Sequence, residues 1–201
     1  MRWFLLVNCL FPMALCAQPA YNELIEQHRQ TYKGEFLEST NSPLRTKEAV
    51  ALIRFYAPDS TYRVVATVQR TQNAQPFAMP TYSGQTSEQV AYAILSFSLH
   101  GKAHRLTVYR SLALANNPKY RNYLFLPFKD GTTGKETYGG GRYLDLRMRD
   151  IQNGQLILDF NKAYNPYCAY AEGYPCPIPP ATNTLSASVR AGERKYVKSH
   201  N

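Results

Sequence analysis

The feature that most restricts the fold of this chain is a series of short segments in which apolar and polar residues alternate. Successive side chains of a β-strand point to opposite faces, so this alternation predicts half-buried antiparallel strands. The clear segments are YRVVATVQR (62–70), FAMPTY (77–82), LSFSL (95–99), HRLTVYR (104–110), YLFLPF (123–128), RYLDLRM (142–148) and QLILDF (155–160). With two weaker runs between residues 186 and 197, we expect about eight or nine strands in a single antiparallel β roll, barrel or sandwich.

Glycines mark two of the turns between these strands. Gly101 separates the LSFSL and HRLTVYR segments, and Asn153-Gly154 stands just before the last clear segment. Asparagine followed by glycine favours a two-residue turn in which both residues have positive φ. We therefore expect a hairpin at each of these positions.

The residues before the strands predict one or two helices. In YNELIEQHRQTYKGEFLE (21–38), apolar residues recur at helical spacing, and we expect the helix to be interrupted or to end near Gly34. Thr46 can cap a second, short helix that begins at the next residue. The chain is thus divided into an N-terminal helical segment (18–60) packed on a β-domain (61–201).

The N-terminus has the pattern of a cleaved signal peptide, residues 1–17. Arg2 is followed by an almost wholly apolar run that ends at Ala17 and is too short to span a membrane comfortably. Cleavage there predicts an exported protein in the periplasm or associated with the cell envelope. The alternative is a lipoprotein signal with Cys16 as the lipidated residue, but Leu15 stands where such signals normally have a small residue.

Removal of residues 1–17 leaves two cysteines, Cys168 and Cys176. In an oxidising compartment they predict one disulfide that pins a C-terminal loop, and it would stabilise the fold by roughly 2–3 kcal/mol in the chain-entropy model. The four histidines are scattered, and nothing in the spacing supplies further donors beside the cysteines. We therefore expect no metal site and no cofactor.

The charge of the chain bears on its partners. The formal net charge is +9 at pH 7, and most of the excess lies between residues 60 and 130. A basic face of this kind favours peripheral contact with anionic envelope surfaces. Nucleic acid is not an expected partner, because no basic-aromatic motif of an RNA- or DNA-binding module is present.

Glycine, charge and aromatic residues concentrate between residues 134 and 183. The triplet Gly139–Gly141 permits positive φ or a close backbone approach, and Arg142 follows it directly. The planar guanidinium of Arg142 could bind a carboxylate or phosphate of a ligand, or a structural aspartate. The triplet could equally form a tight hairpin.

Two aspartates, Asp145 and Asp159, each lie between apolar neighbours in a predicted strand. If those strands are adjacent, the carboxylates share one face and could divide acid and base roles, as in glycoside hydrolysis. A salt bridge to Arg142 or Lys162 is the structural alternative.

The stretch LDFNKAYNPYCAY (158–170) ends a strand in tyrosines, asparagines, a proline and a cysteine. The asparagines can satisfy backbone groups in turns, and a disulfide would hold the tyrosines in place. Rigid tyrosines beside amides suit ligand contact, and they can also cover the edge of a barrel.

These same residues carry a family resemblance. KETYGGGRYLDL, LDFNKAYNPYCAY, YPCPIPP and RAGER closely resemble the signature blocks of a bacterial family catalogued as domain of unknown function 1684. LFLPFKD (124–130) and YRVVATV (62–68) also fit, so the resemblance covers nearly all of the mature chain, in the shorter, exported form of the family. The resemblance implies no established activity, substrate or cofactor.

The leading functional hypothesis is a binding domain for a small polar or anionic ligand. The candidate ligand-binding residues are Glu136, Tyr138, Arg142, Asp145, Asp159, Asn161, Tyr164, Asn165 and Tyr167. One alternative is a hydrolase of envelope or other polymers that draws its acid and base from Asp145, Asp159 and Glu136. The other alternative is a structural component of an envelope assembly.

Overall fold

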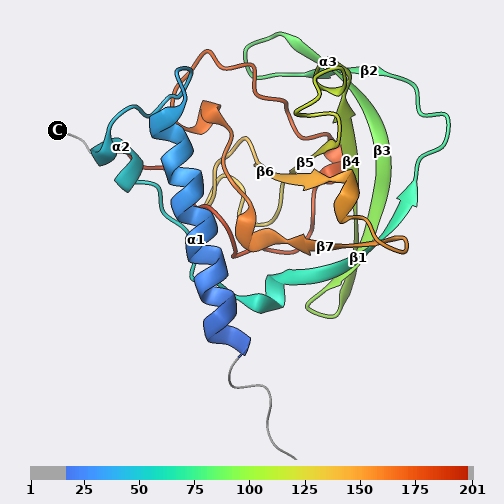
Figure 1. The fold of residues 1–201 in the computed structure, drawn as a ribbon, viewed down its shortest axis with the longest axis horizontal. Coiled ribbons are helices and arrows are strands. Elements are labelled where there is room, and N and C mark those ends of the chain that lie inside the picture. The colour runs from blue at the N-terminus through green and yellow to red at the C-terminus, as the bar shows by residue number, and fades with distance from the viewer. Residues whose placement is uncertain (1–16, 199–201) are drawn as a thin grey trace, which may run out of the picture.

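The computed structural model describes residues 17–198, so the predicted signal peptide lies outside the described residues except for Ala17. Seven antiparallel strands form one sheet, which curls into a half-barrel (Figure 1). The strands are β1 (Arg63–Arg70), β2 (Phe77–Pro80), β3 (Thr86–Leu99), β4 (Lys102–Ser111), β5 (Tyr123–Phe128), β6 (Arg142–Arg147) and β7 (Gln155–Asp159). The mainly β prediction is confirmed, with fewer strands than expected.

The order of strands in the sheet is β6-β5-β4-β3-β1-β7, with β2 paired to β3 beside this path. The two-residue turns predicted from glycine are present: His100 and Gly101 have φ of 49° and 76°, and Asn153 and Gly154 have φ of 50° and 73°. The first turn joins β3 to β4. The second is closed by the pairing of Gln152 with Gln155 and leads into β7.

The α-helices are α1 (Ala17–Glu38), α2 (Lys47–Ala51) and α3 (Leu112–Ala115), and α1 lies beside the open side of the curled sheet in Figure 1. The expected break at Gly34 is wrong, because α1 continues past it. A glycine costs about 1 kcal/mol in a helix, and burial of Ile25 and Phe36 on either side of it offsets that cost. The predicted cap of the second helix is confirmed: the backbone N–H of Ala49 donates to Thr46 Oγ1 at 3.2 Å.

Five short 3₁₀ turns connect the strands and the C-terminal segment. They are η1 (Ser60–Tyr62), η2 (Met148–Asp150), η3 (Phe160–Lys162), η4 (Tyr167–Ala169) and η5 (Ala181–Asn183). None of the helices in the described part of the chain has the length and apolar character needed to cross a membrane.

The main core lies on the inner face of the curled sheet. Its fully or almost fully buried side chains include Leu95, Leu106, Leu124, Leu144, Leu158 and Phe160. On β6 the core face carries residues 142, 144 and 146, and the intervening residues 143, 145 and 147 point to the other face, because strand side chains alternate. That second face supports a separate cluster that contains Met79, Tyr109, Phe125 and Tyr143.

The two weak runs between residues 186 and 197 do not form strands, which corrects the predicted count. This segment is tied to the body of the protein by scattered backbone hydrogen bonds, such as that from Glu193 to Ala163, and by one buried side chain. Arg142 donates to the backbone carbonyls of Val189 (2.8 Å), Ala191 and Glu193 (3.2 Å). Carbonyls that a neighbouring strand would use are therefore satisfied by one buried guanidinium.

The glycine triplet forms a turn that leads into β6. Its last member, Gly141, has a φ of +89°, and a Cβ atom there would lie 2.6 Å from the carbonyl oxygen of Phe128. Glycine is required at this position by both the backbone angle and the close approach. The tight hairpin that Gly139–Gly141 could have formed is not present, because Arg142 pairs with Phe128 of β5; the triplet forms a turn that delivers Arg142 to the core face.

Candidate functional site

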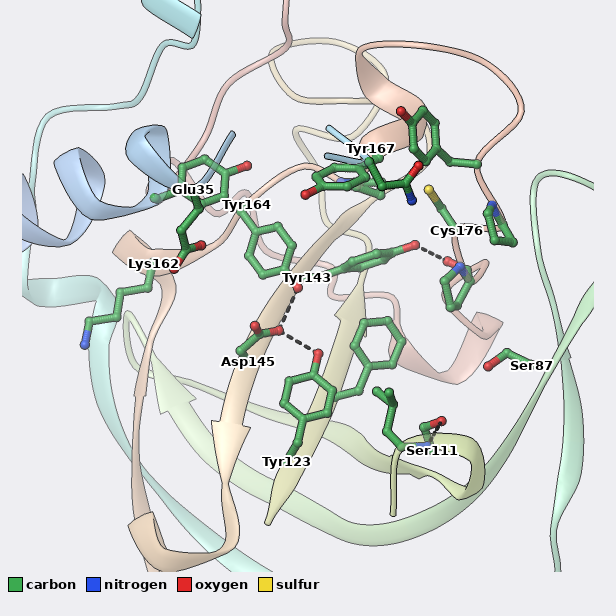
Figure 2. Close-up of a pocket in the computed structure, with 18 of the residues that line it drawn as sticks. Glu35, Ser87, Ser111, Tyr123, Tyr143, Asp145, Lys162, Tyr164, Tyr167 and Cys176 are labelled. Carbon is green, nitrogen blue, oxygen red and sulfur yellow. Dashed lines mark hydrogen bonds between the residues drawn. The ribbon is translucent and has the colours of Figure 1, made fainter. Parts of the chain in front are cut away.

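A cavity of about 820 Å³ lies over the second face of β5 and β6 (Figure 2). Its floor is built by the strand residues that point away from the core, and its walls come from α1, α3, β3 and the segments 162–167 and 174–177. The floor residues are Tyr123, Phe125, Tyr143, Asp145 and Arg147. The alternation of the two strands thus separates the cavity from the core by a single layer of backbone.

Asp145 is the central polar group of this cavity. Its Oδ1 atom accepts a hydrogen bond from Tyr123 Oη at 2.8 Å and another from Tyr164 Oη at 2.6 Å, as Figure 2 shows. The register of the sheet places Asp145 opposite Phe125, and the isolated pairing of Tyr143 with Tyr164 brings the second tyrosine beside β6. Two tyrosines 41 residues apart in the sequence therefore converge on one carboxylate.

The electrostatic environment of Asp145 is perturbed. Its side chain is open to the cavity, but protein surrounds it on most sides. This burial disfavours the ionised form and raises the pKa of the carboxyl above its ordinary value. The hydrogen bonds from Tyr164 and Tyr123, and the charge of Arg147, act in the opposite direction and do not outweigh burial. A carboxyl with a perturbed pKa inside a cavity is a common feature of functional sites.

The tyrosine hydroxyls that surround Asp145 are already committed as donors. Besides the two that bond to Asp145, Tyr143 Oη donates to the carbonyl oxygen of Pro177, and Tyr32 Oη donates to Glu193 at 2.9 Å. Burial raises the pKa of Tyr143 and of Tyr32 above the ordinary value, so both stay protonated. The rings of Phe125 and Tyr143 pack edge to face, with 4.7 Å between their centres.

Two other polar groups in the cavity wall have hydrogen-bonding atoms that no described residue satisfies. Gln89 is 3% exposed; its Nε2 donates to Ser87 Oγ at 2.9 Å, and its Oε1 has no partner. Arg147 Nη1 likewise has none, while its guanidinium lies 5.1 Å from the ring of Tyr123. Native proteins leave few buried polar atoms unpaired, so both mark this wall as unusual.

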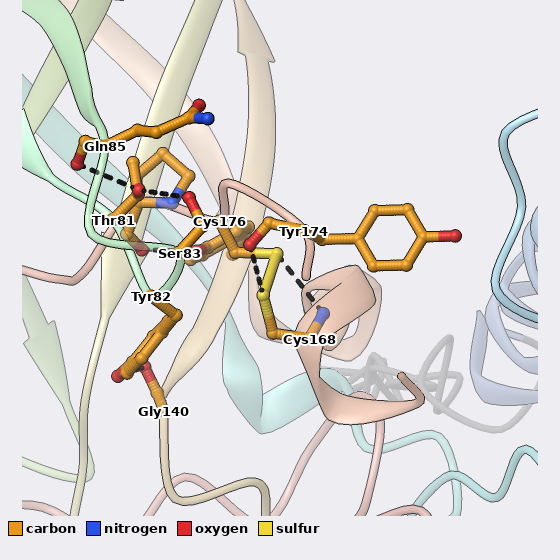
Figure 3. The surroundings of a disulfide bond; sticks show 10 residues. Thr81, Tyr82, Ser83, Gln85, Gly140, Cys168, Tyr174 and Cys176 are labelled. Carbon is orange, nitrogen blue, oxygen red and sulfur yellow. Dashed lines mark hydrogen bonds between the residues drawn. A yellow bond between two sulfur atoms is a disulfide. The ribbon is translucent and has the colours of Figure 1, made fainter. Parts of the chain in front are cut away.

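The cysteine pair forms part of the cavity wall. Cys168 and Cys176 lie at disulfide distance, with their Cα atoms 6.3 Å apart, which agrees with the predicted bond (Figure 3). Cys176 lines the cavity together with Tyr174, and its carbonyl oxygen accepts from the backbone N–H of Tyr82 at 3.0 Å. The disulfide therefore fixes the wall segment 174–177 to η4, and the hydrogen bond from Tyr82 fixes it to the end of β2.

Three of the nine predicted site residues line the cavity: Asp145, Tyr164 and Tyr167. Arg142 does not, because it is 1% exposed on the opposite face of β6 and pairs with Asp130 at 2.8 Å. The guanidinium holds a structural aspartate, which was one of the readings of the sequence, and has no access to a ligand. Its carbonyl partners were described above.

The predicted pair of aspartates does not form, because β6 and β7 stand at opposite ends of the sheet order. Asp159 accepts hydrogen bonds from Tyr21 Oη (2.9 Å) and from the backbone N–H of Asn161 (3.0 Å). Asn161 is fully buried and bonds to both the backbone N–H and the carbonyl of Asp59. Neither aspartate forms the predicted salt bridge to Arg142 or Lys162; tyrosines are their partners instead.

The remaining predicted residues also lie outside the cavity. Glu136 pairs with Arg190 at 3.1 Å near the surface, and Tyr138 packs edge to face against Tyr82. Asn165 is 1% exposed, and its Nδ2 donates to the carbonyl oxygen of Arg194 at 2.8 Å. Glu136 and Asn165 thus hold the C-terminal segment, and Tyr138 packs against the loop after β2.

Sequence reasoning missed most of the cavity. The residues that it overlooked include Tyr32, Glu35, Gln89, Tyr123, Phe125 and Tyr143. A signal for part of the set was available, since residues 143, 145 and 147 share one face of a strand while Arg142 must face the other way. No local signal places α1 beside that face. Among residues 17–198, no group of three or more His, Cys, Asp and Glu side chains is arranged to hold a metal ion.

Comparison with known proteins gives a family and a related structure. The family model described as "Protein of unknown function (DUF1684)" matches residues 48–194. The solution NMR structure of an uncharacterized protein from gene locus rrnAC0354 of Haloarcula marismortui is similar, with a TM-score of 0.68 and 34% sequence identity over 88% of this chain and 95% of that chain. No curated protein matches the chain. The family match covers well over half of the sequence, and the chain therefore belongs to the DUF1684 family.

Proposed function

We propose that this protein is a binding domain that holds a small polar ligand in the cavity over β5 and β6. The observation that carries the proposal is Asp145, a carboxylate that is open to a cavity of about 820 Å³ and surrounded by tyrosine and phenylalanine rings. Ligand sites are typically concave and largely apolar, with a few polar groups that fix orientation. This cavity has that composition and that range of volume.

Hydrolysis by a pair of carboxylates has less support. Of the three acids proposed for that role, only Asp145 lines the cavity, and Asp159 and Glu136 are bonded elsewhere. Binding requires no second acid at a defined distance. We therefore retain ligand binding as the function.

The proposal is tested by blocking the cavity. Ala113 is exposed on α3 and lines the cavity, whereas Ala115 on the same helix does not line it. Ligand-observed NMR with a panel of small amines, sugars and carboxylates should find compounds that bind the wild-type protein and Ala115→Trp but not Ala113→Trp. A panel that binds neither protein, or that binds Ala113→Trp equally well, would overturn the proposal.

A further inference from the structure

The chemistry of the cavity specifies the charge of its ligand, given the proposed binding function. Asp145 takes part in none of the three ion pairs formed among the described residues, which are Arg29–Glu26, Arg142–Asp130 and Arg190–Glu136. Its Oδ1 atom accepts from two tyrosines, and its Oδ2 atom accepts from no described residue. The cavity therefore contains a carboxylate with a free oxygen and no ion-pair partner among the described residues.

The tyrosines around Asp145 offer no free donor for an anion. The hydroxyls of Tyr123, Tyr164, Tyr143 and Tyr32 all donate to protein acceptors. A phosphate or carboxylate placed beside Asp145 would meet a like charge and no free tyrosine proton. A sugar beside Asp145 would find an acceptor for its hydroxyl protons but no free tyrosine proton for its oxygens.

The positive groups that line the cavity form no ion pair with Asp145, although the charge of Arg147 lowers the pKa of its carboxyl. Figure 2 shows the side chain of Lys162 extending away from Asp145 and the tyrosine rings. Arg147 Nη1 is buried in protein, and the guanidinium lies against the ring of Tyr123. Glu35, which also lines the cavity, adds a second negative charge.

Aromatic rings add a further preference for positive charge. The face of a tyrosine or phenylalanine ring attracts a cation that lies within about 6 Å of its centre. Tyr164 stands next to Tyr143 at 5.9 Å and to Tyr32 at 5.8 Å between ring centres, so several rings flank the same space. An ammonium group has only hydrogen-bond donors, and its positive charge would complement the carboxylate of Asp145.

We infer that the ligand is an organic cation, an amine whose ammonium group pairs with the free oxygen of Asp145 and packs against the surrounding tyrosine rings. This inference rests on the proposed function and narrows it. It also replaces the anionic ligand expected from the sequence, because Arg142, the residue behind that expectation, lies on the other face of β6.

Three compounds of similar shape and different charge test the inference: 2-phenylethylamine, 2-phenylethanol and 3-phenylpropionate. A hydrogen bond to a charged group contributes enough for a difference of about 10- to 100-fold in affinity. Titration calorimetry or NMR should show the amine binding more tightly than the alcohol by that factor, and the carboxylate more weakly than both. Asp145→Asn keeps an acceptor for the two tyrosines and should remove the preference, whereas Glu88→Gln, at an exposed position of β3, should not.

Two variants of opposite charge at the exposed residue Ala113 keep the inference testable if Asp145→Asn fails to fold. Ala113→Glu should strengthen amine binding, and Ala113→Lys should weaken it and favour the carboxylate. Alcohol or carboxylate that binds as tightly as the amine, and is still blocked by Ala113→Trp, overturns the cation inference alone. Failure of all three compounds and of the wider panel overturns the inference together with the proposed function.

Discussion

Arg142 and Asp145 stand three residues apart on β6, yet their surroundings differ in almost every respect. Arg142 lies on the core face, with an aspartate and three backbone carbonyls as partners. Asp145 lies on the cavity face, where one oxygen is bonded and the carboxyl keeps a raised pKa. A buried network of this kind holds a fold together, whereas a carboxylate with a free oxygen in a cavity is available to a ligand.

The largest expected effect comes from the core face. Arg142→Ala leaves Asp130 buried without its cation and three carbonyls without a donor, and breaking a buried pair in this way costs roughly 3–5 kcal/mol of stability. Urea unfolding followed by circular dichroism measures the loss. Arg190→Ala, which removes an exposed pair, is the matched control and should change stability little, because solvent screens such a pair. Equal effects of the two variants would contradict the contrast between the faces.

The next effect concerns Glu193, which joins the two regions. Its carboxylate accepts from Tyr32 of the cavity wall and from Tyr170, and burial raises its pKa from 4.5 to about 7. The folded state keeps a proton that the unfolded state releases above pH 4.5, so this contribution is complete below that pH. It is then lost as the pH rises to about 7, by on the order of 3 kcal/mol.

Glu193→Gln should flatten this part of the stability curve, because the amide does not titrate. Chemical unfolding at a series of pH values in the wild-type protein and the variant gives the difference directly. If the difference between the two proteins rises with pH in favour of the wild type, the assignment of a raised pKa is wrong.

A smaller effect is expected on the cavity side from the disulfide. Replacing both Cys168 and Cys176 by serine releases a short loop, at a cost of roughly 2–3 kcal/mol in the chain-entropy model. Because Cys176 lines the cavity, the double variant should also weaken ligand binding. Thermal unfolding and ligand titration of the same sample separate the two consequences; unchanged binding would show that the wall keeps its shape without the bond.

The smallest effect on stability is expected at Asp145 itself. Burial disfavours the ionised form of its carboxyl. Asp145→Asn removes the charge but keeps an oxygen that can accept from Tyr123 and Tyr164. Stability at pH 7 should therefore change by less than about 1 kcal/mol. Chemical unfolding of Asp145→Asn and Arg142→Ala under the same conditions compares the two faces directly. A loss of stability of similar size in both variants would show that Asp145 is also a structural residue.

The contrast between these two residues could have been read in part from the sequence. An odd separation along a strand places two side chains on opposite faces, so Arg142 and Asp145 could not share a site once RYLDLRM was accepted as a strand. The identity of the core face follows from Leu144 and Leu146. The sequence did not show which elements cover the other face, because α1 reaches that face only through the tertiary structure.

Local chemistry is what the sequence by itself determined. Alternation set the strands, Asn153-Gly154 and His100-Gly101 set two turns, and Thr46 set a helix start, because each depends on neighbours that are close along the chain. Cys168 and Cys176 are only eight residues apart, so their proximity is also largely local. The tertiary structure decided the rest. Pairing of distant strands put β6 and β7 at opposite ends of the sheet, and it brought Tyr123 and Tyr164 to the same carboxylate. Such long-range contacts depend on the packing of the whole sheet, which no local pattern encodes.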